Sequence, residues 1–212
     1  MSQSDASHVA LSYLFQKDSG DYGVYDFHLS GNERLLNDEI DWRTCRKQRF
    51  AHCIELDDIS KISLPGFINK VVANEKISFG IDWLGNIGTL DPATGIYTPP
   101  ADKPGFTCAT FLDEVFRAFG FELVDMPTWP RDDAQTIKWR DDLADRLEKN
   151  GKTPAEVIAR IRETDPVMRL LPSEFAAAAA SGLDDWPLNK ESAFEAACEI
   201  IEDFNKARGN NS

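Results

Sequence analysis

Cysteine and histidine are the two residue types in this chain that could together carry out nucleophilic catalysis. Among the cysteines, Cys108 stands apart because it follows the turn-forming residues PGF at 104–106 and begins an apolar helical segment. Unpaired main-chain N–H groups and the helix dipole at such a position are expected to lower the pKa of a thiol. The resulting thiolate would be a nucleophile, and the same N–H groups could stabilise an oxyanion.

A nucleophilic thiol needs a base, and the sequence holds three histidines that could supply one: His8, His28 and His52. Each candidate also has a purely structural interpretation. Cys108 could be a buried small side chain, because free cysteines are among the most buried residues. His8 could belong to a disordered terminus, and His28 could simply hydrogen-bond the backbone of a strand.

Three segments of the sequence resemble the NlpC-type branch of the papain-like cysteine peptidases. The run GFTCATFLDEVFRAFGFELV, 105–124, resembles the helix that carries the family's nucleophile, and Cys108 falls on that cysteine. The run SHVALSYLF, 7–15, resembles the strand that carries the base, and His8 falls on that histidine. The run VYDFHLS, 24–30, resembles the next strand, in which a polar residue orients the base, and His28 falls on that residue.

The order of these segments differs from the family's usual order. In the family the cysteine helix precedes both strands, whereas here both histidines precede Cys108, so the resemblance implies a circularly permuted arrangement. A catalytic triad is defined by geometry and roles and not by chain order, so permutation leaves the chemistry possible. One position departs from the family pattern: Phe79 stands where the family often has a tyrosine near the oxyanion, and phenylalanine has no hydroxyl to donate.

The resemblance implies a cysteine hydrolase that cleaves an amide or peptide-type acyl bond through an acyl-enzyme, with a peptide or other small acyl compound as substrate. Two alternatives remain open. The same cysteine and histidine could serve an acyltransferase or a thioesterase acting on lipids, which permuted relatives of the fold exemplify. The chain could also be a non-catalytic protein-interaction module that keeps the fold and uses Cys108 structurally.

The third member of the proposed triad has a competing pair of candidates in the run AHCIELDD. His52 could replace His28, and Glu55 could orient an imidazole equally well. Alternating residues of a strand point to opposite faces, so at most one of His52 and Glu55 would point into a given cleft. The neighbouring Asp57 and Asp58 lack the spacing of a calcium loop, and we expect no metal and no cofactor.

Short apolar or alternating runs predict the strands that would position the histidines. We expect strands over 9–15, 24–30 and 50–56 to form a small antiparallel sheet, with a further strand over 76–83. The segment 85–105 is rich in Gly, Asp and Pro and predicts a long surface loop.

Helical periodicity is clearest over 107–119, where apolar residues recur on one face and Gly120 supplies a stop signal. A shorter helix is expected within 59–74, after the break signalled by Pro65 and Gly66. The C-terminal region predicts helices over 132–149, 153–163 and 190–206, and the alanine run 176–180 is a strong helix former.

The length, net charge and N-terminal sequence of the chain indicate its class and location. A chain of 212 residues favours one α+β domain, here divided into a papain-like core over 1–128 and a helical extension over 129–212 that we expect to govern substrate choice. The formal net charge of −13 disfavours binding to nucleic acid or to anionic membranes. The N-terminus lacks an apolar signal segment and no run is long enough to span a bilayer, which predicts a cytoplasmic protein.

Overall fold

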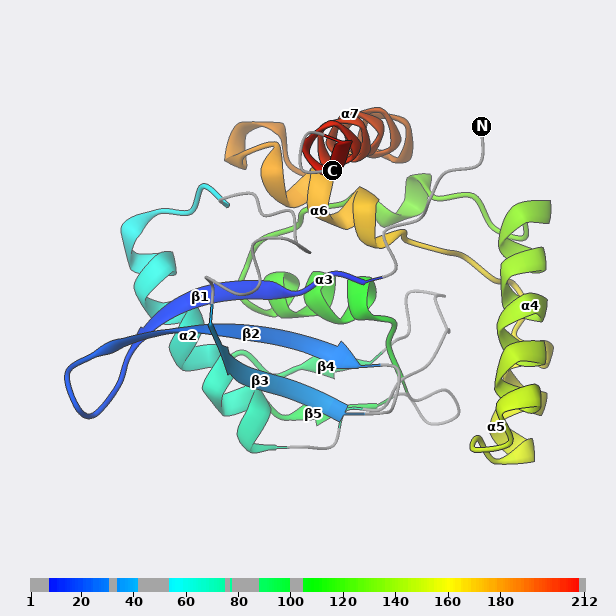
Figure 1. The fold of residues 1–212 in the computed structure, drawn as a ribbon, viewed down its shortest axis with the longest axis horizontal. Coiled ribbons are helices and arrows are strands. Elements are labelled where there is room, and N and C mark those ends of the chain that lie inside the picture. Colours follow the sequence, from blue (N-terminus) through cyan, green and yellow to red (C-terminus); the bar gives the residue numbers. More distant parts are fainter. Residues whose placement is uncertain are drawn as a thin grey trace.

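Strands lie mainly in the N-terminal half of the chain and helices in the C-terminal half (Figure 1). The computed structural model describes residues 8–30, 34–41, 54–74, 77, 88–99 and 105–209. The strands are β1 Leu11–Gln16, β2 Tyr22–Ser30, β3 Arg34–Ile40, β4 Thr89–Leu90 and β5 Tyr97–Thr98. The helices are α2 Asp58–Ala73, α3 Cys108–Ala118, α4 Ala134–Asn150, α5 Ala155–Glu163, α6 Pro172–Ala180 and α7 Lys190–Gly209, with 3-10 turns η1 Met126–Thr128 and η2 Leu183–Asp185.

The main sheet has three antiparallel strands in the order β1-β2-β3. The register pairs Leu11 with Phe27 and His28 with Leu36. The first two strands agree with the sequence prediction, but the third was predicted at 50–56 and is found at β3 instead. Residues 54–56 are not a strand, and the rest of that predicted segment lies outside the described residues.

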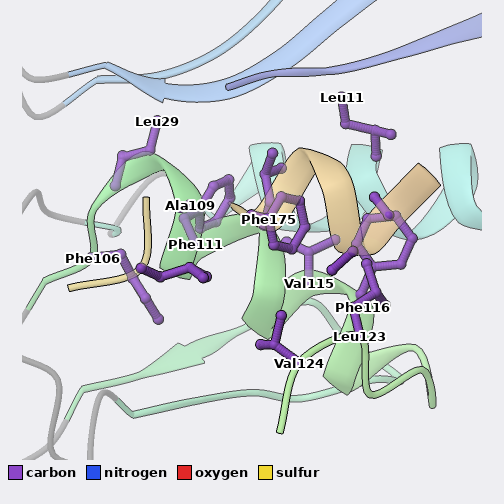
Figure 2. Close-up of a cluster of buried hydrophobic side chains, with 14 of the residues drawn as sticks. Leu11, Leu29, Phe106, Ala109, Phe111, Val115, Phe116, Leu123, Val124 and Phe175 are labelled. Atoms are coloured by element: carbon purple, nitrogen blue, oxygen red, sulfur yellow. The ribbon is translucent and has the colours of Figure 1, made fainter. Parts of the chain in front are cut away.

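Helix α3 packs against one face of this sheet. Phe27 of β2 contacts Phe111 of α3, with ring centroids 5.1 Å apart, and both side chains are fully buried. Leu29 approaches the first turn of α3 near Ala109, and Phe175 of α6 packs against the helix near Val115 and Phe116 (Figure 2). The predicted α+β arrangement, a small antiparallel sheet against this helix, is therefore present.

The helix was predicted only after a break at Pro65 and Gly66, but α2 already begins at Asp58 and continues through Pro65. The side chain of Asp57 caps the helix by accepting the N–H groups of Ile59 and Ser60. Pro65 lies inside the helix and is buried. Proline has no N–H to donate to the carbonyl four residues earlier, so the helix lacks one main-chain hydrogen bond at this point. The apolar side chains around it, including Leu64, Phe67 and Ile68, are buried in the core, and their packing offsets the lost hydrogen bond.

The predicted loop over 85–105 contains a short hairpin, β4 and β5, in its described part. Leu90 of β4 donates its N–H to the carboxylate of Glu114 on α3, over 2.9 Å. Tyr97 of β5 contacts Phe106 with tilted rings, whose centroids are 5.0 Å apart. The hairpin therefore packs against α3 and the residues that precede it.

The C-terminal helices contribute to the same core as the N-terminal strands. The main cluster of buried apolar side chains includes Trp129, Met168, Leu170 and Phe175 together with the sheet and α3. Helices α4 and α5 pack mainly on each other around a second, smaller cluster, and they stand at one end of the molecule (Figure 1). Within the parts of the chain that the structure describes, no helix is both long and apolar enough to cross a membrane.

Candidate active site

The first turn of α3 is held by a reciprocal cap that fixes where Cys108 lies. Thr107 precedes the helix in an extended conformation, and its hydroxyl accepts the N–H of Thr110 over 3.2 Å. The N–H of Thr107 donates in turn to the hydroxyl of Thr110 over 2.8 Å. This capping box starts the helix at Cys108, as the sequence predicts, and orients the N–H groups of its first turn.

Three main-chain N–H groups lie close enough to the sulfur of Cys108 to lower the pKa of its thiol. Two come from the start of α3 itself, from Cys108 and Ala109, and the third comes from Val9, the residue after His8. The segment that leads into β1 therefore lies near the sulfur, about one hundred residues away along the chain. This proximity brings together two of the three segments on which the sequence prediction depends.

The sequence predicted a lowered pKa for the Cys108 thiol, and this prediction is wrong. The residue is only 8% exposed, and burial raises the pKa of its thiol above the ordinary value. The three N–H donors and the charge of Arg169 lower the pKa, but burial has the larger effect. At neutral pH the resting side chain is therefore a thiol, and a base must remove its proton before it can attack.

His8 and His28 contact each other through their rings. The Nε2 atom of His8 lies 2.7 Å from Nδ1 of His28, within hydrogen-bonding distance, and the ring planes are inclined by 75°. The structure thus brings the predicted base and the predicted orienting residue together. Because this contact uses Nε2 of His8, the second ring nitrogen, Nδ1, is the atom with which His8 can accept another proton.

His28 lies on the sheet face opposite the α3-packed face. Phe27 and Leu29 are fully buried and flank His28 in β2, so the alternation of the strand directs His28 away from their side. Partial burial lowers the pKa of His28, and the negative charge of Asp38 on β3 only partly opposes this. His28 is accordingly neutral at pH 7, with one ring nitrogen as donor and the other as acceptor.

The sequence offered two alternatives to His28, and the structure describes only one of them. Glu55 is exposed and precedes α2, and His52 lies outside the described residues, as does Phe79. Asp57 caps α2 and Asp58 lies in its first turn, so both have a local helical role. Among the described residues, no three His, Cys, Asp or Glu side chains come together in a manner that could hold a metal ion.

Arg169 is a residue near Cys108 that the sequence prediction missed. It lies between α5 and α6, and its positive charge acts on the Cys108 thiol. Its guanidinium carbon is 4.5 Å from the centroid of the Trp139 ring on α4. No local pattern marks this arginine, because its position depends on how the C-terminal helices pack against α3.

A shallow depression elsewhere on the surface contains none of the predicted site residues. It lies at the start of α7 and is lined by Thr128, Asn189, Lys190, Glu191 and Phe194. Trp129, beside it in sequence, is buried and donates its indole N–H to Glu174. This tryptophan therefore has a packing role and does not wall the cysteine site.

Comparisons of the chain with protein-family models, with curated proteins and with solved structures found no match.

Proposed function

We propose that this protein is a papain-like cysteine hydrolase that cleaves an amide-type acyl bond, with Cys108 as nucleophile, His8 as base and His28 as the residue that orients His8. The observation that carries the proposal is the contact between the start of β1 and α3. The N–H of Val9 is close enough to the Cys108 sulfur to lower the pKa of the thiol, and His8, the residue before Val9, is hydrogen-bonded to His28. The proposal requires the exposed ring of His8 to reach the Cys108 sulfur, because covalent catalysis needs a base that takes the proton of the nucleophile.

In the proposed first half-reaction, Nδ1 of His8 takes the thiol proton as the sulfur of Cys108 attacks the acyl carbonyl. The raised pKa of Cys108 requires that proton transfer and attack are coupled, since little thiolate exists beforehand. The N–H groups of Cys108 and Ala109 would receive the oxyanion. Collapse of the tetrahedral intermediate breaks the bond to the leaving amine, which takes the proton from His8 and leaves a thioester on Cys108.

In the second half-reaction, water replaces the amine. His8 accepts a proton from the attacking water, and the thioester carbonyl again becomes tetrahedral. When the C–S bond breaks, the proton returns from His8 to the sulfur and the carboxylic acid product leaves. Neutral His28 would accept the Nε2 proton of His8 throughout and so keep Nδ1 in its basic form.

A second candidate function is a non-catalytic interaction module in which Cys108 is structural. The low exposure of Cys108 and its raised pKa favour this alternative, because a structural cysteine is buried and inert. The two proposals differ in one measurable respect: only the hydrolase requires His8 for reaction at Cys108.

The test uses p-nitrophenyl acetate, an activated ester that acylates reactive cysteines. For a hydrolase we expect release of p-nitrophenolate and a single acetyl group on Cys108, identified by peptide mass spectrometry. The substitution His8→Ala should slow acylation by roughly 10²- to 10⁴-fold, the usual contribution of a general base. The partly buried Cys198 supplies the matched control, because Cys198→Ala should leave the reaction unchanged.

Slow acetylation of several cysteines, insensitive to His8→Ala, would favour the interaction module. Circular dichroism of each variant establishes that the substitution has not unfolded the chain. Full acetylation of Cys108 in the His8→Ala variant at the unchanged rate would remove His8 from the mechanism.

A further inference from the structure

Strand β1 forms one outer edge of the three-stranded sheet. It pairs with β2 on one side, and no strand among the described residues pairs with its other side. Figure 1 shows β1 and β3 as the outer strands, with β2 between them. Alternate residues of an edge strand direct their main-chain N–H and C=O groups away from the sheet, where these groups can pair with another strand. The partner that fits this edge is therefore an extended segment of polypeptide.

The two outer strands of the sheet differ in charge. β3 carries Arg34, Asp38 and Glu39 among its seven residues, whereas β1, with the sequence LSYLFQ, carries no charged residue and no proline. Charged side chains and proline on an edge strand oppose its pairing with another chain. By this criterion β3 is protected against such pairing and β1 is open to it.

Apolar side chains of β1 are exposed on both faces of the sheet. Leu14 is 61% exposed and Phe15 is 37% exposed. Leu11 pairs with Phe27, whose ring packs on α3. The alternation of the strand therefore places Phe15 on the α3 side of the sheet and Leu14 on the opposite side. A partner strand would cover both side chains and add hydrophobic stabilisation to the main-chain hydrogen bonds.

The sequence of β1 is complementary to itself when two copies run antiparallel with Leu14 opposite Leu14. Tyr13 then lies opposite Phe15, and Ser12 lies opposite Gln16. Opposite residues share a face of the sheet, so this register pairs leucine with leucine, aromatic with aromatic and polar with polar. A register centred on Tyr13 would place Leu14 against Ser12, and one centred on Phe15 would place it against Gln16.

The charge of the molecule favours the same contact. The formal net charge of −13 makes two copies repel each other over most of their surfaces. Contact through β1 brings uncharged residues closest together. The charge next to β1 in the chain is that of Lys17, and it is paired with Glu39 over 2.6 Å. A second copy of the chain can therefore approach this edge without placing like charges in contact.

We propose that β1 is a self-association surface, on which a second copy of the chain pairs its own β1 antiparallel about a two-fold axis at Leu14. The two three-stranded sheets then form one continuous sheet of six strands. Because six-residue strands bury less surface than a standard interface, we expect a dissociation constant in the micromolar range. Salt should strengthen the dimer, since it screens the repulsion between two acidic chains. This proposal does not depend on the chemistry assigned to Cys108.

Sedimentation equilibrium of the full-length chain under reducing conditions tests the proposal. Between about 1 and about 500 µM, which brackets a micromolar dissociation constant, the wild-type mass should rise from that of one chain to twice that value. Leu14→Lys should weaken dimerisation by at least about tenfold, because it removes two apolar contacts and places two like charges opposite each other. Ile62→Lys is the matched control: Ile62 is 80% exposed on α2, the charge change is the same, and the wild-type dissociation constant should be kept.

A crosslinking experiment tests the register. Leu14→Cys should give a covalent dimer with a short bis-maleimide, because directly opposite residues have Cβ atoms about 5 Å apart. Gln16→Cys should not, since in this register the two substituted positions are offset by about 13 Å along the strands. Peptide mass spectrometry separates this linkage from reactions of the native cysteines. The test needs no lysine on the strand, so it also decides the proposal if circular dichroism shows that Leu14→Lys is unfolded.

Three results would each overturn the proposal. A wild-type chain that stays monomeric over the whole concentration range means that another segment of the chain or a different protein covers this edge, or that nothing does. A folded Leu14→Lys variant that dimerises as tightly as wild type places the interface elsewhere. Crosslinking at Gln16→Cys and not at Leu14→Cys contradicts the register. Neither acylation of Cys108 nor its dependence on His8 enters these measurements, so the proposed function and the self-association can fail separately.

Discussion

The main-chain N–H of Val9 lies close enough to the sulfur of Cys108 to lower the pKa of its thiol, which places the segment before β1 near the first turn of α3. This proximity involves the main chain and not the side chain at position 9. The preceding residue, His8, has an exposed side chain that is hydrogen-bonded to His28 over 2.7 Å. The segment before β1 therefore connects the paired histidines with the surroundings of Cys108.

The contact between His8 and His28 predicts that different substitutions at position 28 slow the acylation of Cys108 to different extents. His28→Ala removes the acceptor of the His8 Nε2 proton, so we expect acylation by p-nitrophenyl acetate to slow by roughly 10- to 100-fold through loss of the correct tautomer. His28→Gln keeps a hydrogen-bonding side chain and should recover part of the rate. Equal rates for wild type and His28→Ala would mean that His28 does not orient the base.

The raised pKa of Cys108 predicts its reactivity with pH. In the folded chain the rate of iodoacetamide labelling at Cys108 should rise through a midpoint higher than that of the same cysteine in the urea-denatured chain, because burial disfavours the thiolate. Because the pKa of Cys108 is raised in the folded chain, its thiol contributes to the free energy of unfolding. This contribution is fully present below the unfolded pKa and is lost as pH rises through the folded pKa. A midpoint below that of the denatured chain would show that the N–H donors outweigh burial.

The buried carboxylate of Asp113 leads us to predict a second pH dependence of the free energy of unfolding, at lower pH than that of Cys108. It lies on α3, is 3% exposed, and one of its carboxylate oxygens has no hydrogen-bond partner among the described residues. Burial raises its pKa from 3.8 to about 7, so the folded chain holds a proton that the unfolded chain releases. Stability from this group is complete below pH 3.8 and falls by about 4 kcal/mol as pH rises to 7.

Asp113→Asn tests this assignment, since the amide is neutral and has nearly the same shape. The free energy of unfolding, measured in urea, should exceed that of wild type by a few kcal/mol at pH 8, and the difference should shrink toward pH 4. Asp142→Asn on the exposed surface of α4 is the control and should change little. A constant difference between Asp113→Asn and wild type at all pH values would show that Asp113 does not titrate in this range.

The ion pair between Glu174 and Lys190 joins α6 to α7. Glu174 is fully buried and also accepts the indole N–H of Trp129 over 3.2 Å and the N–H of Leu171 over 3.0 Å. Lys190→Met leaves this carboxylate without its cation, and we expect a loss of about 3 kcal/mol in the free energy of unfolding. Lys138→Met breaks an exposed pair with Asp142 and should cost less than about 1 kcal/mol.

The double variant Lys190→Met with Glu174→Gln separates the two possible causes of that loss. If the cost arises from an uncompensated buried charge, neutralising Glu174 should recover a large part of the stability. If it arises from loss of the Lys190 ammonium over the Trp129 ring, 5.6 Å from its centroid, the double variant should be no more stable than Lys190→Met.

The sequence by itself determined the local elements of this protein. Apolar spacing over 107–119 and the stop at Gly120 predicted α3 to within a residue or two at each end, since caps and side-chain periodicity act between near neighbours. The apolar run at 9–15 and the alternation at 24–30 predicted β1 and β2 for the same reason. The pairing of His8 with His28 was expected only from a family resemblance.

Only the tertiary structure decided which segments meet and how deeply they are buried. The polar segment that forms β3 becomes a strand because the open edge of β2 pairs with it, and α2 continues through Pro65 because its apolar face packs in the core. The pKa of Cys108 rises because the sheet, α3 and the C-terminal segments together exclude water, a property that no single segment encodes. The positive charge of Arg169 acts on the thiol for the same reason, since desolvation and long-range charge depend on the whole fold and not on local pattern.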